Sequence, residues 1–251
     1  MKNTERFSTR VENYVKYRPH YPDTLLPFLK EAGVLHPETI VADIGAGTGI
    51  SASPFLENGN EVYAVEPNAE MREKMVDLLS PYQNFKAIAG TAEHTTLPDN
   101  SIDLIIAGQA FHWFDPAASK IEFERIGKPG SYIALIWNVR QVESPFEKAY
   151  EVLLRKYGTD YKEVNHKNIG EAQMNSFFGP QGYKLKSLNH LQLFDLKGIK
   201  GRLMSASYAP LHGPEHDAMM RELEEIYEKN NENGMVKFHF HTEIYLGPTH
   251  A

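Results

Sequence analysis

The chain of 251 residues contains no cysteine, which excludes disulfide bonds and cysteine-ligated metal sites. It has no apolar run near the roughly 20 residues of a membrane span, and its polar N-terminus lacks the apolar segment of a signal peptide. Acidic residues outnumber basic ones, 33 to 26, and the net charge of −7 argues against nucleic-acid binding through a broad basic surface. We therefore expect a cytoplasmic protein that binds neither a membrane nor a nucleic acid; a monomer or a homodimer is consistent with the sequence.

The most informative stretch that is present covers residues 41–49. A short apolar run leads through Asp43 to glycines at alternate positions, Gly45, Gly47 and Gly49, with Ala46 between the first two. A buried parallel strand has such an apolar run, and glycines after it let the backbone turn sharply and approach a ligand closely. A helix that begins behind the loop would offer free N–H groups to an anion. The stretch predicts a nucleotide-like ligand at the end of the first strand.

Segments typical of strands and helices alternate after this loop, and the pattern changes near residue 140. Strands are predicted at 40–44, 61–65, 85–89, 103–107, 131–137, 183–194 and 237–246, with a turn at 127–130. Helices are predicted at 22–32, 50–57, 116–126, 195–205 and 214–231, with a short one near 171–178. Two more are predicted from their caps: one begins after Asn68, and one runs from a capping box at 144–147 to about residue 157. The expected fold is α/β and Rossmann-like: a mostly parallel seven-stranded sheet with an antiparallel edge strand, helices on both faces and a small helical cap.

Ligands of an open α/β sheet bind beyond the carboxyl ends of its strands. Glu66 ends the second predicted strand, 23 residues after Asp43, close to the separation expected of an acid that holds ribose hydroxyls. A merely solvated glutamate is the plain alternative, and the glycine loop before it favours ribose binding. Residues 90–93 follow the third strand and residues 108–114 follow the fourth, so we expect both segments at the same edge.

The segment after the fourth strand is rich in aromatic residues. Phe111, Trp113 and Phe114 are consistent with a core position, but their clustering in a loop favours a pocket wall. His112 is the best candidate for a general base, because histidine titrates near neutral pH. A packing or hydrogen-bonding role for His112 is an equal alternative.

Other substrate candidates lie toward the two ends of the chain. The run through Tyr17 and Arg18 is interrupted twice by proline and predicts either a packed arm or a lid. Arg18 and Arg140 are candidates to hold an acidic substrate bidentately, although a surface position is the plainer expectation for each. Tyr208 lies between late elements and is a further candidate for the acceptor pocket. We predict no metal site, because His239 and its strand neighbour two residues on lack a third ligand at a suitable spacing.

In combination, these motifs resemble class I S-adenosylmethionine-dependent methyltransferases of the methyltransferase type 11 kind. The resemblance covers roughly residues 10–140 and rests on residues 43–49, 66–68, 90–93, 97–103 and 109–114. The Tyr-x-x-Tyr-Arg-Pro-x-Tyr-Pro and Phe-His-Trp-Phe-Asp blocks look most like the trans-aconitate methyltransferase-like branch, which methylates carboxylates of small acids. The resemblance implies one methyltransferase domain over 1–251, with an arm or lid at 1–34, a cofactor-binding core at 35–140 and a substrate cap within 141–251.

The resemblance also implies which residues bind S-adenosyl-L-methionine. The glycine loop and Gln109 should lie near the methionine part, Glu66 should bind the ribose, and Met71 should pack on the adenine. The residues expected to bind the cofactor are Asp43, Gly45, Ala46, Gly47, Gly49, Glu66, Pro67, Met71, Thr91, Ala92, Glu93 and Gln109.

Three functions are consistent with the sequence. The leading one is methyl transfer from S-adenosylmethionine to an oxygen, carboxylate or hydroxyl, of a small molecule; a hydroxyl acceptor needs a general base and a carboxylate does not. A nicotinamide-dependent oxidoreductase is disfavoured, because the third glycine comes one residue earlier than in G-x-G-x-x-G. A non-catalytic S-adenosylmethionine-binding regulatory protein stays open, because methyl transfer has no obligatory catalytic residue by which a sequence could exclude it.

Overall fold

The computed structural model describes residues 20–159, 161, 170–206 and 208–250. Its centre is a seven-stranded sheet in the order β3-β2-β1-β4-β5-β7-β6. The strands are β1 (Val41–Ile44), β2 (Val62–Val65), β3 (Phe85–Ile88), β4 (Ile102–Gly108), β5 (Gly127–Arg140), β6 (Lys184–Phe194) and β7 (Val236–Pro248). β1 to β5 pair in parallel, and β7 is antiparallel to both of its neighbours.

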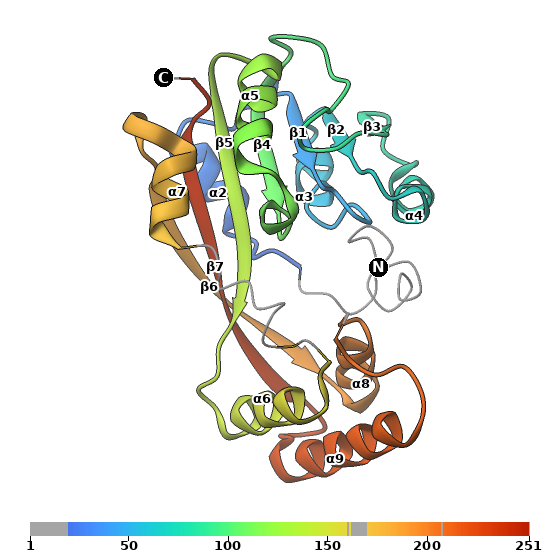
Figure 1. Cartoon of the computed structure of the whole chain (residues 1–251). Helices are drawn as coiled ribbons and strands as arrows, with labels where there is room; N and C mark the ends of the chain where they lie inside the picture. Colours follow the sequence, from blue (N-terminus) through green and yellow to red (C-terminus); the bar gives the residue numbers. More distant parts are fainter. Residues whose placement is uncertain (1–19, 160, 162–169, 207, 251) are drawn as a thin grey trace.

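Helices cover both faces of this sheet (Figure 1). They are α2 (Leu25–Glu31), α3 (Ser53–Glu57), α4 (Ala69–Leu79), α5 (Pro116–Ile126) and α7 (Glu171–Phe178), with short 3-10 turns η3 (Phe111–Trp113) and η5 (Gly179–Gln181). One buried cluster joins the sheet to α2, α3 and α4, and a second joins it to α5 and α7. All four residues of β1 are buried, as expected of a parallel strand covered on both sides.

Three more helices form a second lobe at the far end of the long strands. α6 (Pro145–Tyr157), α8 (Leu196–Met204) and α9 (Pro214–Asn230) gather there, away from β1 to β3 (Figure 1). β6 and β7 pair over eleven successive positions, so one two-stranded ribbon runs from the sheet into this lobe. The lobe has its own buried cluster, in which Phe238 packs against Phe146 and Tyr150 with ring centroids 5.1 and 5.0 Å away.

The predicted elements are confirmed, with three differences in detail. The helix expected at 50–57 begins at Ser53, because the chain is still turning after Gly49. The turn expected at 127–130 is the start of β5, where Gly127 pairs with Ile102 across an irregular register. The antiparallel strand is β7, one position in from the edge, and β6 is the edge strand. No helix among the described residues is long and apolar enough to span a bilayer.

Phe238→Ala should lower the free energy of unfolding by about 3–5 kcal/mol, because the ring is fully buried between α6 and the β6–β7 ribbon. The measurement is urea unfolding followed by circular dichroism. Leu185→Ala, at a half-exposed position of β6, is the matched control and should change stability by less than about 1 kcal/mol. Equal losses in the two variants would contradict the proposed core of the second lobe.

Candidate functional site

The loop after β1 is shaped by its glycines. Gly45, Gly47 and Gly49 have φ of +71°, +60° and +88°, a region that favours glycine. A Cβ at Gly45 would lie 2.7 Å from the Cβ of Ala110, and one at Gly49 would lie 2.4 Å from Cδ1 of Leu79. The loop therefore requires glycine both for its backbone conformation and for its packing.

Glu66 fixes this loop to the end of β2. Its Oε2 accepts a hydrogen bond from the backbone N–H of Gly47, and its Oε1 accepts one from the N–H of Asn68, both at 2.8 Å. The side chain of Asn68 in turn accepts from the N–H of Met71 and caps α4, as predicted. Burial raises the pKa of the Glu66 carboxyl, and the two amides oppose that rise. Each carboxylate oxygen can accept a further bond, so the group can still receive ribose hydroxyls.

Asp43 is a second buried carboxyl beside the loop. Ser51 Oγ donates to its Oδ2 at 2.6 Å, while its Oδ1 is buried and has no hydrogen-bond partner within the described residues. Burial raises the pKa of Asp43 to about 7, and the nearby Glu66 carboxylate adds to the rise. The site thus places two carboxyl groups close together out of water, an arrangement that favours a positively charged ligand.

Four backbone amides of the loop itself are already bonded within the protein, and the helix expected to offer free N–H groups begins only at Ser53. Gly45 N–H and Ala46 N–H both donate to the carbonyl of Val65, and Gly49 N–H donates to the carbonyl of Ala46. The Gly47 N–H goes to Glu66, as described above. A pyrophosphate would find none of these four donors available and would meet two carboxyl groups.

The residues expected around an adenine lie at the same edge. Met71 is buried, and its Sδ lies 4.0 Å from the Cβ position of Gly47. Ala92 is also buried, whereas Pro67 and Thr91 are exposed at the rim. Glu93 Oε1 accepts from the backbone N–H of Asp115 at 2.9 Å, which ties this segment to the start of α5.

The segment after β4 divides into core and site residues. Gln109 has a left-handed φ of +58°; its Nε2 donates to the carbonyl of Asn138, and its Oε1 is buried without a partner among the described residues. Phe111 is fully buried, with the Phe177 ring 4.7 Å away, so its prediction as a substrate contact is wrong: its side chain belongs to the core. His112 and Trp113 are half-buried, with ring centroids 4.6 Å apart, and remain at the edge of the site.

A network of polar side chains on β5, β6 and β7 was not predicted. Asn138 Nδ2 donates to the carbonyl of His20 at 3.3 Å, and Thr242 Oγ1 donates to Asn138 Oδ1 at 2.6 Å. Gln192 Nε2 donates to the same His20 carbonyl at 3.4 Å, and His190 Nδ1 lies 3.4 Å from Thr242 Oγ1. His190 and Gln192 share the half-buried face of β6 with Leu188 and Phe194. Little in the sequence signals this, because three leucines of the strand lie on the opposite, exposed face.

Two of the other predicted substrate residues are committed to intramolecular contacts. Arg140 is not a surface residue: it pairs with Glu151, donates to Tyr161 Oη and stacks over the rings of Tyr150 and Phe238, with its Nη1 buried and unpartnered within the described chain. Its charge is therefore compensated, which weakens its prediction as a clamp for an acidic substrate.

Tyr208 packs against the ring of Tyr161 at 4.8 Å, in the second lobe. Tyr17 and Arg18 lie outside the described residues.

Possible metal ligands were predicted not to gather at one site. The described ranges contain no group of three or more histidine, aspartate or glutamate side chains placed to hold a metal ion. His239 is exposed on β7 and contacts Glu147 at 3.0 Å.

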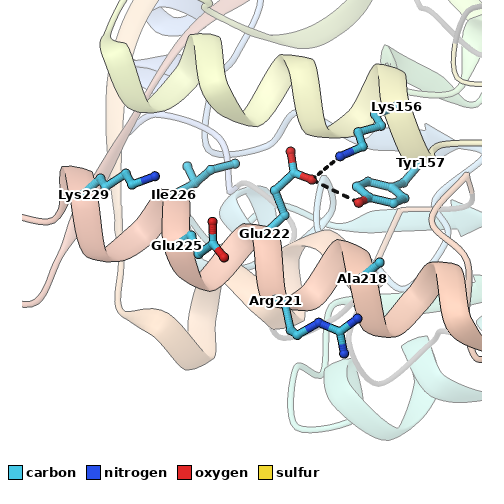
Figure 2. Close-up of a pocket in the computed structure, with 8 residues that line it drawn as sticks. All are labelled: Lys156, Tyr157, Ala218, Arg221, Glu222, Glu225, Ile226 and Lys229. Carbon is cyan, nitrogen blue, oxygen red and sulfur yellow. Dashed lines mark hydrogen bonds and ion pairs between the residues drawn. The ribbon is translucent and has the colours of Figure 1, made fainter.

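A shallow pocket of about 460 Å³ lies between α6 and α9 (Figure 2). Glu222 of α9 accepts from Lys156 Nζ at 2.6 Å and from Tyr157 Oη at 3.0 Å, and these bonds join the two helices.

Known proteins resemble this chain most clearly in its first half. Residues 42–135 match a family model described as a methyltransferase domain. A Mycobacterium tuberculosis protein named as an uncharacterized methyltransferase is 37% identical over 134 residues, 53% of this chain and 52% of the relative. One from Schizosaccharomyces pombe is 30% identical over 151 residues, 60% of this chain and 59% of the relative. The chain therefore spans about half the length of the curated relatives it matches.

The fold is found in solved structures as well. A structure from Anaeromyxobacter dehalogenans, assigned as a type II methyltransferase, superposes with a TM-score of 0.70 at 20% identity, covering 93% of this chain and 98% of the other. At this identity the likeness bears on the fold, which is the class I methyltransferase sheet with its antiparallel β7.

Asp43→Asn should flatten the pH dependence of stability. A raised pKa means that, between about pH 4 and pH 7, the folded protein holds a proton that the unfolded chain has released, so stability falls as pH rises. The slope from one such group approaches about 1.4 kcal/mol per pH unit. Urea unfolding at several pH values measures it. Asp77→Asn, exposed on α4, is the control and should keep the parent slope, and an unchanged slope in Asp43→Asn would contradict the buried, proton-holding carboxyl.

Proposed function

We propose that this chain is a class I S-adenosylmethionine-dependent methyltransferase and that it transfers a methyl group from this cofactor to an oxygen of a small molecule; the match of residues 42–135 to a methyltransferase domain supports the proposal. We further propose that residues 1–251 act as one unit. In it, residues 1–34 contribute an arm over the site, residues 35–140 bind the cofactor, and residues 141–251 supply the acceptor side.

The observation that carries this proposal is the chemistry of the loop after β1. Asp43 and Glu66 are both buried, and Asp43 Oδ1 has no hydrogen-bond partner in the described structure. S-adenosylmethionine carries a sulfonium and an ammonium group, so it fits two buried carboxyls better than an anionic dinucleotide does. The loop amides, which a dinucleotide pyrophosphate would need, are bonded within the protein. This disfavours the alternative function of a nicotinamide-dependent oxidoreductase.

The other residues of the proposed cofactor site would contact the ribose, the adenine and the methionine part. Glu66 would accept the ribose hydroxyls with the lone pairs that its two backbone amides leave free. Met71 and Ala92, both buried at this edge, would enclose the adenine. Gln109, the first residue after β4, would lie next to the methionine part.

The cofactor supplies an already activated methyl group, so the protein's contribution is alignment and exclusion of water. The half-buried residues His112 and Trp113 would form the wall beside the acceptor. His112 would take the proton of a hydroxyl acceptor.

The acceptor atom is proposed to be oxygen. A Yersinia pestis relative named malonyl-[acyl-carrier protein] O-methyltransferase is 27% identical over 201 residues, 79% of this chain. The finer resemblance to the trans-aconitate branch suggests a small carboxylic acid. The site gives that suggestion less support, because Glu151 already compensates the charge of Arg140.

Glu66→Ala should weaken binding of S-adenosylhomocysteine by about 10- to 100-fold, because hydrogen bonds to a charged group are worth about 1.5–3 kcal/mol. Isothermal titration calorimetry of the parent and the variant measures this. Glu70→Ala, exposed four residues later, is the matched control and should bind as the parent does. Glu66→Gln, which retains one acceptor oxygen, should lie between them.

The same titration separates the competing functions. Binding of NAD without binding of S-adenosylhomocysteine would overturn the proposal. Binding of S-adenosylhomocysteine with no turnover of S-adenosylmethionine across hydroxyl, amine and carboxylate acceptors would favour the non-catalytic regulatory function.

A further inference from the structure

Polar side chains from four strands or strand ends converge at the junction of the two lobes. We call them the Asn138 network; its members are the His20 carbonyl, Gln109, Asn138, His190, Gln192 and Thr242. Strand register explains the convergence. Asn138 lies opposite Thr242, and His190 lies opposite Phe240, so these side chains share one face of the β5–β7–β6 ribbon.

The hydrogen bonds within the network determine which side-chain atoms of its two glutamines have no partner. Gln109 and Gln192 each use their Nε2 to donate to a backbone carbonyl, of Asn138 and of His20 respectively. Because a carbonyl can only accept, the amide orientations are determined. The Oε1 atoms of both glutamines are then buried acceptors with no donor among the described residues.

The same reasoning assigns the free atom of His190. Asn138 Nδ2 donates to the carbonyl of His20, so its Oδ1 is an acceptor and takes the hydroxyl proton of Thr242. Thr242 Oγ1 can then only accept from His190 Nδ1, 3.4 Å away. Burial lowers the pKa of His190, which favours the neutral ring, although the nearby His20 carbonyl opposes this shift. In the neutral ring with its proton on Nδ1, Nε2 is a lone-pair acceptor, and it too is buried and unpartnered in the described structure.

Three buried acceptor atoms of this network, Gln109 Oε1, Gln192 Oε1 and His190 Nε2, therefore have no donor among the described residues. Buried acceptors of this kind are normally satisfied, so their donors are expected to come from outside the described residues. The nearest cation on the same ribbon, Arg140, is paired with Glu151 and adds little net positive charge. The three side chains are themselves only half-buried, so small side-chain rotations would present these atoms to a ligand.

We propose that the Asn138 network is the acceptor subsite, and that it selects small molecules which bring hydroxyl or N–H hydrogen-bond donors. This rests on the proposed methyltransferase function and deepens it. A fully deprotonated carboxylate has no donor and would set its charge against three lone pairs, so the network discriminates against it. His190 and Gln192 are specificity residues in this scheme, and neither is part of the cofactor site.

The test compares donor-bearing and donor-free ligands of one shape. Benzyl alcohol, benzylamine, benzamide and benzoate are titrated against the protein saturated with S-adenosylhomocysteine, by saturation-transfer NMR. The first three should bind the parent, and benzoate should bind at least about 10-fold more weakly, the factor that about 1.4 kcal/mol represents.

Two variants address the network itself. His190→Phe keeps a ring to stack on Phe240 and removes the lone pair, and Gln192→Leu keeps the size of the side chain and removes the amide. Each should weaken the donor-bearing ligands by about 10-fold or more, while benzoate should bind no more weakly than to the parent, because a lone pair that repels it is gone. Gln192→Glu, which keeps an acceptor oxygen, should retain benzylamine. Leu191→Thr, on the opposite face of β6, is the matched control and should behave as the parent does.

The outcomes separate this proposal from the one it rests on. S-adenosylhomocysteine should bind the parent and all variants equally, which also shows that they are folded. Failure of the parent to bind it would overturn the methyltransferase function. Binding of S-adenosylhomocysteine together with a preference for benzoate, with no difference between parent and variants, or with no ligand bound at all, would overturn the acceptor subsite alone.

Discussion

The cofactor site depends on one interaction, the pair of hydrogen bonds between the Glu66 carboxylate and the backbone N–H groups of Gly47 and Asn68. It joins the loop after β1 to the loop after β2, and Asn68 then caps the helix that carries Met71. A single side chain thereby sets the relative positions of three structural elements around the ligand. Because both oxygens keep a free lone pair, the group that holds the site together can also contact the ligand.

The electrostatics of the site follow from burial. Asp43 and Glu66 have little positive charge nearby beyond Arg72, so burial keeps their pKa values high. A cationic ligand beside these two carboxyl groups would favour their charged forms. The same pair, with four loop amides bonded internally, is the basis on which we disfavour a dinucleotide as the ligand.

The second lobe serves the site through the long strands. β5, β6 and β7 run out of the sheet and are anchored at their far ends by α6, α8 and α9 (Figure 1). This anchoring holds rigid a ribbon whose near part carries Asn138, Thr242 and His190 on one face. The acceptor subsite that we propose is thus built on a sheet, which positions side chains more firmly than loops do.

The sequence by itself determined the order of strands and helices, the glycine loop, and Glu66 as its partner. These are local properties, because hydrophobic periodicity, caps and the φ of glycine depend on near neighbours in the chain. Only the tertiary structure decided that Phe111 is core, that Arg140 is paired with Glu151, and that Asn138 meets His190 across β7. Those facts depend on strand register and on contacts between residues far apart in the chain, and no local pattern specifies either of them.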